Sequence, residues 1–188
     1  EDAEPSPVDV SLPAPDPADL LEEVLHKSNN FYTEVLLHHI ALTENDRSQA
    51  AGIDLMEGVM IRAGAADSDF NFADGSGLSV YDRMTPAAMT DLLVWASRQD
   101  WYDTWSGLLS RGGQDGTLQY RFQKLGRADR LRAKTGSLTG VGALAGYFET
   151  SDGTTYAFAI FANDSSLSSS RTRARLDELL EDIIELLE

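Results

Sequence analysis

Residues 130–162 read RLRAKTGSLTGVGALAGYFETSDGTTYAFAIFA, and this stretch indicates the fold class of the 188-residue chain. Residues 130–135 alternate between polar and apolar side chains, which is typical of a half-buried strand. Residues 142–149 and 154–162 are strand-like, and the segment 151–153 between them carries a hairpin signal. We therefore expect three strands that form one antiparallel sheet.

An amphipathic helix is expected to close the chain and to pack on this sheet. Arginines stand at the start of residues 171–187 and glutamates at the end, so the charges oppose the helix dipole. Docking on the sheet must therefore hold this helix in place. Its predicted apolar stripe consists of Leu176, Leu179, Leu180, Ile183, Ile184 and Leu187.

The first two thirds of the chain are predicted to be mainly helical. Asp16-Pro17 and Thr85-Pro86 each combine a capping residue with a first-turn proline, and Gly64 ends a third helical pattern. Residues 70–74 alternate in polarity and then break at a glycine-rich turn. The predicted helices cover residues 17–26, 31–40, 47–63, 86–98, 101–109 and 117–122.

Residues 1–16 differ in composition from the rest of the chain. They carry prolines among acidic and small residues, so we expect an extended or loosely held segment, with residues 8–10 as a candidate edge strand. We expect residues 17–188 to form one folded unit. The chain begins at Glu1 without a basic and apolar leader, which we interpret as a cut made by processing or by cloning.

Charge and composition exclude several classes of function. The 15 Lys+Arg and 31 Asp+Glu give a net charge of −16, which repels phosphate backbones, so we expect no nucleic-acid partner. No apolar run approaches the roughly 18 residues that span a bilayer, so we expect no membrane span. The chain has no cysteine, which rules out disulfides, thiolate metal sites and a cysteine nucleophile.

The segment Lys134-Thr135-Gly136-Ser137 combines chemical groups that suit the capture of a carboxylate. The lysine supplies a positive charge at the end of a predicted strand, and Thr135 and Ser137 supply hydroxyls. Gly136 lets a ligand approach the backbone. Taken alone, the segment favours the plainer interpretation of a surface lysine that leads into a turn.

Ser28-Asn29-Asn30 lies between two predicted helices. Taken alone, it is compatible with a plain cluster of helix-capping residues. Together with the later K-T-G, however, its S-x-N pattern supplies two of the three signatures of the serine penicillin-binding and β-lactamase group.

Three longer segments make the resemblance more specific: DGSGLS at 74–79 with YDR at 81–83, GQDGTL at 113–118 with Arg121, and RAKTGSLTGV at 132–141. Over residues 18–165 the chain resembles the D-alanyl-D-alanine carboxypeptidase/endopeptidase family of penicillin-binding protein 4 type (peptidase family S13). The resemblance implies an α+β fold, the β-lactamase/DD-peptidase-like transpeptidase fold, with an antiparallel sheet packed with helices. About three strands of that sheet, its C-terminal portion, are expected here.

The third signature, S-x-x-K, is missing from the chain. Lys27, Lys124 and Lys134 are its only lysines, and none has a serine three positions before it. In the family this motif supplies the nucleophilic serine and lies far upstream. The chain therefore resembles the C-terminal part of a longer enzyme, and we expect the isolated chain to be inactive.

The resemblance implies a role for each residue of the two motifs. Ser28 would relay a proton, Asn30 would orient the substrate amide, and Lys134 would ease proton movement by its charge and attract the terminal carboxylate. Thr135, Gly136 and Ser137 would bind substrate, and the backbone N–H of Ser137 would be one oxyanion donor.

Other residues receive weaker assignments. Asp74 and Ser76 belong to a loop that either lines the site or only makes a tight turn. Arg121 is expected to form a structural ion pair, and the tryptophans at 95, 101 and 105 are spaced for packing. The histidines at 26, 38 and 39 form no metal site that the sequence supports. We expect neither a metal nor a cofactor.

The resemblance also implies partners and a location. Peptidoglycan stem peptides would be the substrates, β-lactams the inhibitors, and the periplasm or the cell exterior the location. Because the first strands of the family's sheet lie upstream, we expect partly uncovered apolar faces on residues 142–149 and 154–162. These faces would be covered by self-association or by the N-terminal half of the protein. Two other hypotheses are a non-catalytic module that binds stem peptides and a folding unit without a function of its own.

Overall fold

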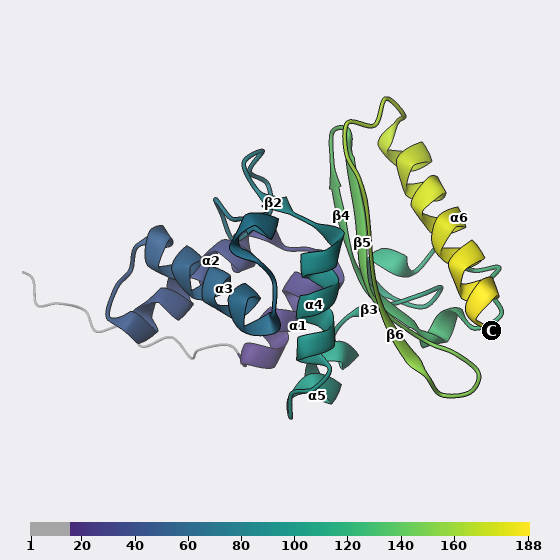
Figure 1. Cartoon of the computed structure of the whole chain (residues 1–188), viewed down its shortest axis with the longest axis horizontal. Coiled ribbons are helices and arrows are strands. Elements are labelled where there is room, and N and C mark those ends of the chain that lie inside the picture. Colours follow the sequence, from purple (N-terminus) through teal and green to yellow (C-terminus); the bar gives the residue numbers. More distant parts are fainter. Residues whose placement is uncertain (1–15) are drawn as a thin grey trace, which may run out of the picture.

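The computed structural model describes residues 16–188 (Figure 1). The expectations for residues 1–15, including the candidate edge strand at 8–10, lie outside the described residues. Within residues 16–188 the fold is α+β, as predicted. Figure 1 shows a sheet with one helix on its right-hand side and the other helices gathered on its left.

The main sheet has four antiparallel strands in the order β3-β4-β5-β6. The predicted three strands are β4 (Leu131–Leu138), β5 (Val141–Glu149) and β6 (Thr155–Ala162), and their antiparallel pairing is confirmed. The prediction missed β3 (Ser110–Arg111), because two residues are too few to show a period. A separate pair, β1 (Phe70–Asn71) and β2 (Arg83–Met84), was also missed as a sheet.

The short strand β3 leaves most of the edge of β4 open. β3 pairs only with the start of β4, where Ser110 lies opposite Ala133 and Arg111 opposite Arg132. Among the described strands, none pairs with residues 134–138 on this side. The segment Lys134-Thr135-Gly136-Ser137 therefore lies on a free sheet edge.

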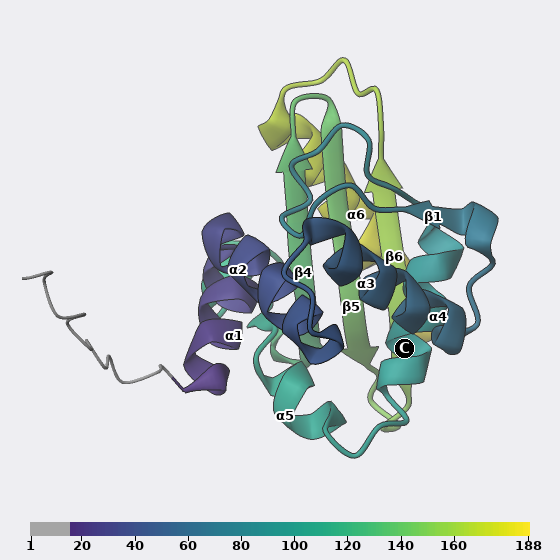
Figure 2. The same cartoon turned by 90° about the vertical axis from the view of Figure 1, so that its left-hand side faces the viewer.

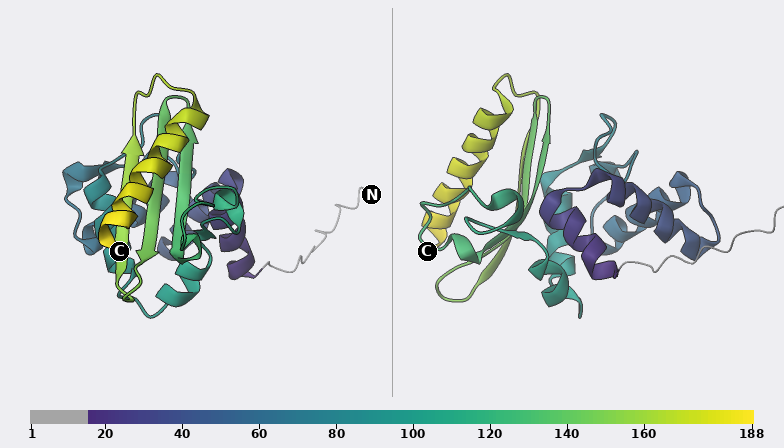
Figure 3. Two further views of the ribbon diagram at one scale, coloured as in Figure 1. Left: turned by 90° about the vertical axis from the view of Figure 1, so that its right-hand side faces the viewer. Right: turned by 180° about the vertical axis from the view of Figure 1, so that it is seen from behind.

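Helix α6 (Ser169–Leu187) covers one face of the sheet (Figure 3). Its buried residues Leu180 and Ile184 form one core with Leu131, Leu144 and Phe148 of the strands. The predicted six-residue stripe is too wide. Leu176, Leu180 and Ile184 are buried, whereas Leu179, Ile183 and Leu187 are 47%, 37% and 38% exposed, because the sheet contacts only a narrow strip of the helix.

Helices α4 (Pro86–Ala96) and α5 (Tyr102–Gly107) pack on the opposite face. The Tyr147 hydroxyl of β5 donates a hydrogen bond to the Leu93 carbonyl at 2.7 Å, and burial raises the pKa of this phenol. The Tyr147 ring makes edge contacts with Tyr102 and Trp105. The tryptophans at 95, 101 and 105 contact one another in sequence, which confirms that they serve packing.

Three further helices stand in front of the sheet when the molecule is turned as in Figure 2. They are α1 (Pro17–Lys27), α2 (Asn30–Ala41) and α3 (Gln49–Ala63). Asp16 caps α1, Thr85 caps α4 and Gly64 ends α3 with a positive φ, so the predicted caps are confirmed. The helix predicted at 117–122 is wrong. A single 3-10 turn, η3 (Gly116–Leu118), stands there because positive φ values at Gly116 and Phe122 interrupt the α-helix.

The remaining short elements are the 3-10 turns η1 (Leu42–Glu44), η2 (Asp67–Asp69) and η4 (Ala128–Arg130). None of the helices in residues 16–188 combines the length and the apolar character that a membrane span requires. The expected uncovered face is wrong for β5, because α4, α5 and α6 together bury most of it. The expectation holds in part for β6, where Tyr156 is 39% exposed.

Leu179 and Leu180 of α6 differ in burial, so truncating each should lower the free energy of unfolding by a different amount. We expect Leu180→Ala to lower the free energy of unfolding by about 2–5 kcal/mol, because it leaves a cavity in the core. Leu179→Ala, the matched control, should cost less than about 1 kcal/mol. Urea unfolding followed by circular dichroism measures both. Equal costs would contradict the described docking of α6.

Candidate active site

The junction between α1 and α2 gives Ser28 an unusual backbone conformation. Ser28 has φ +57°, a left-handed conformation that costs a non-glycine residue about 1 kcal/mol. The Asn29 N–H bonds the Glu23 carbonyl of α1, and the Asn29 side chain caps α2 by accepting from the Tyr32 N–H. The segment Ser28-Asn29-Asn30 therefore ends α1 and starts α2, and Ser28 lies at the junction of the two helices.

Ser28 meets Lys134, which is 106 positions later in the sequence. The Lys134 Nζ donates to the Ser28 Oγ at 2.7 Å and to the Thr135 carbonyl at 2.8 Å. Burial lowers the pKa of Lys134. Both oxygen atoms are neutral, and within residues 16–188 no carboxylate forms an ion pair with this ammonium. Only the dipoles of these neutral groups therefore stabilise the Lys134 ammonium. A lysine in this environment gives up its proton more easily, which favours proton exchange with the Ser28 hydroxyl.

Asn30 is the first residue of α2 and lies two positions after Ser28. Its side-chain amide makes no hydrogen bond to residues 16–188, although the Asn30 carbonyl accepts from the Thr33 hydroxyl at 2.7 Å. Its donor and acceptor therefore remain open to a ligand. Within residues 16–188 this amide makes no hydrogen bond to Lys134, so the role of Asn30 stays a prediction.

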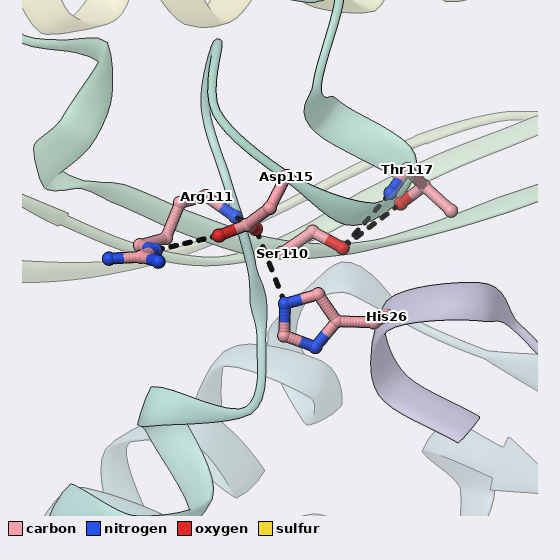
Figure 4. Close-up of polar contacts among 5 residues, drawn as sticks. All are labelled: His26, Ser110, Arg111, Asp115 and Thr117. Atoms are coloured by element: carbon pink, nitrogen blue, oxygen red, sulfur yellow. Dashed lines mark hydrogen bonds and ion pairs between the residues drawn. The ribbon is translucent and has the colours of Figure 1, made fainter. Parts of the chain in front are cut away.

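A chain of hydroxyls links the strand edge to η3. The Thr135 Oγ1 donates to the Thr117 Oγ1 at 3.0 Å, and the Thr117 N–H donates to the buried Ser110 Oγ at 3.1 Å. Figure 4 shows Thr117 above Ser110 in this arrangement. Thr135, Gly136 and Ser137 also line a cavity of about 250 Å³. The three predicted substrate-binding residues therefore share one concave surface.

A second polar group, centred on Asp115, lies next to Ser110 and His26 (Figure 4). Asp115 accepts from the Arg111 N–H at 2.7 Å and from the Arg111 Nε at 2.8 Å, and it lies 3.3 Å from the His26 Nε2. Burial alone would raise the pKa of Asp115. The hydrogen bonds and charge of Arg111, with the charge of His26, outweigh burial and hold that pKa below its usual range.

Gly116 explains why α1 can lie so close to this turn. It has φ +53°, and a Cβ at this position would stand 2.2 Å from the Ser110 Oγ and 3.0 Å from the His26 Cδ2. Sequence reasoning considered His26 only as a metal ligand and missed its contact with Asp115. The available signal was the place of His26 on the last turn of α1, two residues before Ser28.

The loop with Asp74 and Ser76 packs on α2. Asp74 accepts from the Gly77 and Ser79 N–H groups, and the N–H groups of Gly75 and Ser76 donate to the Glu34 carboxylate at 3.1 and 2.9 Å. These bonds account for the tight turn. Within residues 16–188 neither Asp74 nor Ser76 bonds Ser28 or Lys134, so a role in the site stays a prediction. The structural ion pair expected of Arg121 is confirmed, and its partner is Asp177 of α6.

A helical layer packed on a helix-backed antiparallel sheet is the β-lactamase-like and DD-peptidase-like fold. A class A β-lactamase from Bacteroides cellulosilyticus shares this fold with a TM-score of 0.68 at 21% identity, over 89% of this chain and 61% of that chain.

The sequence assigns the chain to one family of proteins with this fold. The profile of the D-Ala-D-Ala carboxypeptidase 3 (S13) family matches residues 10–183, and the chain belongs to this family. The resemblance drawn from the motifs is therefore confirmed.

Two relatives show how much of the family's length is present. The chain is 32% identical over 155 residues to the D-alanyl-D-alanine carboxypeptidase of Actinomadura sp. (strain R39), which covers 79% of this chain and 29% of that protein. The structure of penicillin binding protein 4 from Haemophilus influenzae, complexed with a novel β-lactam, matches with a TM-score of 0.78 and 27% identity, over 90% of this chain and 41% of that chain. The chain thus spans less than half of either relative.

The close approach of α1 to Gly116 is testable by adding one methyl group. We expect Gly116→Ala to lower the free energy of unfolding by about 2–4 kcal/mol, because strain at positive φ adds to a clash with Ser110. Gly153→Ala is the matched control, since Gly153 has φ +87° with open space around it, and it should cost about 1 kcal/mol. If thermal unfolding gives the two variants the same stability, the described contact is wrong.

The lowered pKa of Lys134 predicts an alkaline trend in stability. The unfolded chain holds the proton up to pH values near 10.5, whereas the folded chain releases it at lower pH, so stability rises as pH passes through this window. Relative to Lys134→Met, the wild type should therefore gain unfolding free energy between pH 7 and about 10.5. Lys27→Met, which removes an exposed amine, should show no such gain. Urea titrations at several pH values measure the trend, and a flat difference for Lys134→Met would contradict it.

Proposed function

We propose that this chain is the C-terminal part of a serine D-Ala-D-Ala carboxypeptidase/endopeptidase that hydrolyses peptidoglycan stem peptides through an acyl-enzyme. The observation that carries the proposal is the 2.7 Å hydrogen bond between the Lys134 Nζ and the Ser28 Oγ, in a chain of this family. Such a bond forms only if two distant motifs fold into one site.

Each of the two bonded groups has a defined part in the proposed reaction. When a serine attacks the D-Ala carbonyl, the departing amine needs a proton, and the Ser28 hydroxyl supplies it. Ser28 is reprotonated through its hydrogen bond to Lys134, whose burial lowers the pKa and so eases the transfer. Asn30 orients the substrate amide from the start of α2.

The strand edge supplies binding and charge stabilisation. Thr135, Gly136 and Ser137 bind the substrate along β4, and the Ser137 N–H donates to the developing oxyanion. A single oxyanion donor contributes about 10²–10³ in rate. The second donor and the attacking hydroxyl belong to an S-x-x-K segment, which these 188 residues do not contain. We therefore propose that the isolated chain forms no acyl-enzyme.

A second candidate function is a non-catalytic module that binds stem peptides. The cavity beside Thr135 and Ser137 favours this alternative, because it is complete without the missing nucleophile. An in-frame S-x-x-K upstream of Glu1 in the natural gene would support the enzyme. An initiator methionine or a secretion signal just before Glu1 would support the module.

The proposed substrate implies further partners and a location. β-Lactams would bind the complete site, and the protein would act in the periplasm or outside the cell, where peptidoglycan lies. The half-exposed face of β6, with Tyr156 39% exposed, would contact either a second copy of the chain or an N-terminal half.

Fluorescent penicillin tests the division of the site between two segments. We expect no covalent label on the isolated chain, because no described serine combines an activating lysine with the S-x-x-K spacing. We expect labelling after an S-x-x-K-containing N-terminal segment of the natural protein is added, either fused to the chain or co-expressed with it. The label is measured on a denaturing gel.

Two variants make this result interpretable. Lys134→Met should reduce labelling of the joined protein strongly, whereas Lys124→Met, outside the motif, should leave it unchanged. A labelled band on the isolated chain would show that one of its own serines is the nucleophile. That result would refute the proposed assignment of Ser28.

A further inference from the structure

The loop between β1 and β2 is closed by two aspartates. Asp82 accepts from the Ala73 N–H at 2.7 Å through Oδ1. Asp74 accepts from the Gly77 N–H at 2.6 Å through one oxygen and from the Ser79 N–H at 2.7 Å through the other. The two carboxyl groups therefore hold together the two ends of the loop and the turn between them.

No cation compensates these two carboxyl groups in the part of the chain that the structure describes. Neither Asp74 nor Asp82 forms an ion pair there. Arg83 of β2 donates to two carbonyls of the loop and not to a carboxylate. Glu34 of α2 accepts from two N–H groups of the loop, and α3 contributes only a neutral amide. The loop therefore combines three carboxyl groups with one guanidinium that is bonded elsewhere.

The second carboxyl oxygen of Asp82 lacks a partner. Its Oδ2 atom is buried and makes no hydrogen bond within residues 16–188. Burial raises the pKa of Asp82, the Ala73 N–H opposes this effect, and the Asp74 carboxylate, which lies within hydrogen-bond reach, raises the pKa further. A protonated carboxyl group donates to a neighbouring carboxylate, so a proton on Oδ2 would give this buried atom a partner.

We propose that the loop of residues 73–82 is a pH-sensitive clasp, in which Asp82 carries a proton on Oδ2 and donates it to Asp74. With the proton in place, the pair has one negative charge and closes the loop. When the proton leaves to solvent, two adjacent carboxylates repel each other and the loop loosens from α2. The side chains of Leu78, Val80 and Tyr81, each more than half exposed on this loop, would move with it.

This inference stands without the proposed function, because it concerns only the conformation of the loop. The sign of the pH dependence follows from the direction of the pKa shift. The folded chain holds the Asp82 proton to a higher pH than the unfolded chain, in which aspartate titrates near 3.8. The stabilising contribution of the clasp is therefore present in acid and is lost as pH rises through the folded-state pKa of Asp82.

The variant Asp82→Asn tests the clasp, because its amide group donates at every pH where the carboxyl group needs a proton. At pH 7 we expect its equilibrium constant of unfolding to be at least about threefold smaller than that of the wild type, with a smaller gain at pH 5. Asp91→Asn is the matched control, since it removes an exposed charge of α4 that makes no side-chain hydrogen bond or ion pair within residues 16–188. It should gain less than Asp82→Asn. Urea unfolding followed by circular dichroism measures all three proteins.

Nuclear magnetic resonance of the wild type tests the same proposal without a variant. A pH titration followed at the carboxyl carbons of ¹³C-labelled aspartate should give Asp82 a midpoint above 3.8. Protection of the Ala73 and Ser79 amides from hydrogen exchange should fall as Asp82 ionises, and it should stay constant in Asp82→Asn.

Three results would overturn the clasp. One is an Asp82 midpoint at or below 3.8. Another is equal stability of Asp82→Asn and Asp91→Asn at pH 7. The third is a loss of amide protection that is the same in the wild type and in Asp82→Asn, because the loop would then respond to a different titrating group.

Discussion

A partly buried ammonium that has no carboxylate partner within residues 16–188 is the constraint on which this structure depends. Lys134 is held between the Ser28 hydroxyl and a backbone carbonyl, and its charge is therefore only partly compensated. Burying a charge in this way is unfavourable unless surrounding dipoles are fixed in place. The left-handed backbone of Ser28, itself a strained conformation, is one of these fixed elements. The rest of the fold holds the Lys134 Nζ and the Ser28 Oγ 2.7 Å apart.

Two sets of contacts fix the position of the helical layer relative to the sheet edge. On one face, the core of α6 with β4 and β5 makes the strand edge rigid. On the other, His26 of α1 rests against Asp115 and Gly116, and Thr117 of the same turn bonds Thr135. The G-Q-D-G-T-L segment is therefore a bridge between the serine and the strand. Its glycine and aspartate act by positioning the groups around them.

Much of the fold was predictable because its signals are local. Capping residues, the hairpin turn and the period of β4 to β6 are each encoded within a few neighbours, and the motifs at 28–30 and 134–137 identified the family. The strand β3 was not predictable, since two residues carry no period and owe their conformation to pairing with β4. The contact between His26 and Asp115 was missed for a related reason. These two residues belong to distant segments of the sequence, and only the folded chain brings them together.

Because β3 is short, most of the outer edge of β4 is available for main-chain hydrogen bonds to a ligand. Beyond Ala133, the outer edge of β4 offers backbone donors and acceptors that no described strand uses. An extended peptide lying there would be bound as an extra strand, through its main chain rather than through its side chains. Affinity would then depend on an extended conformation and on correct alignment with the strand. Side chains of the peptide that make no contact with the protein could then vary widely without loss of binding.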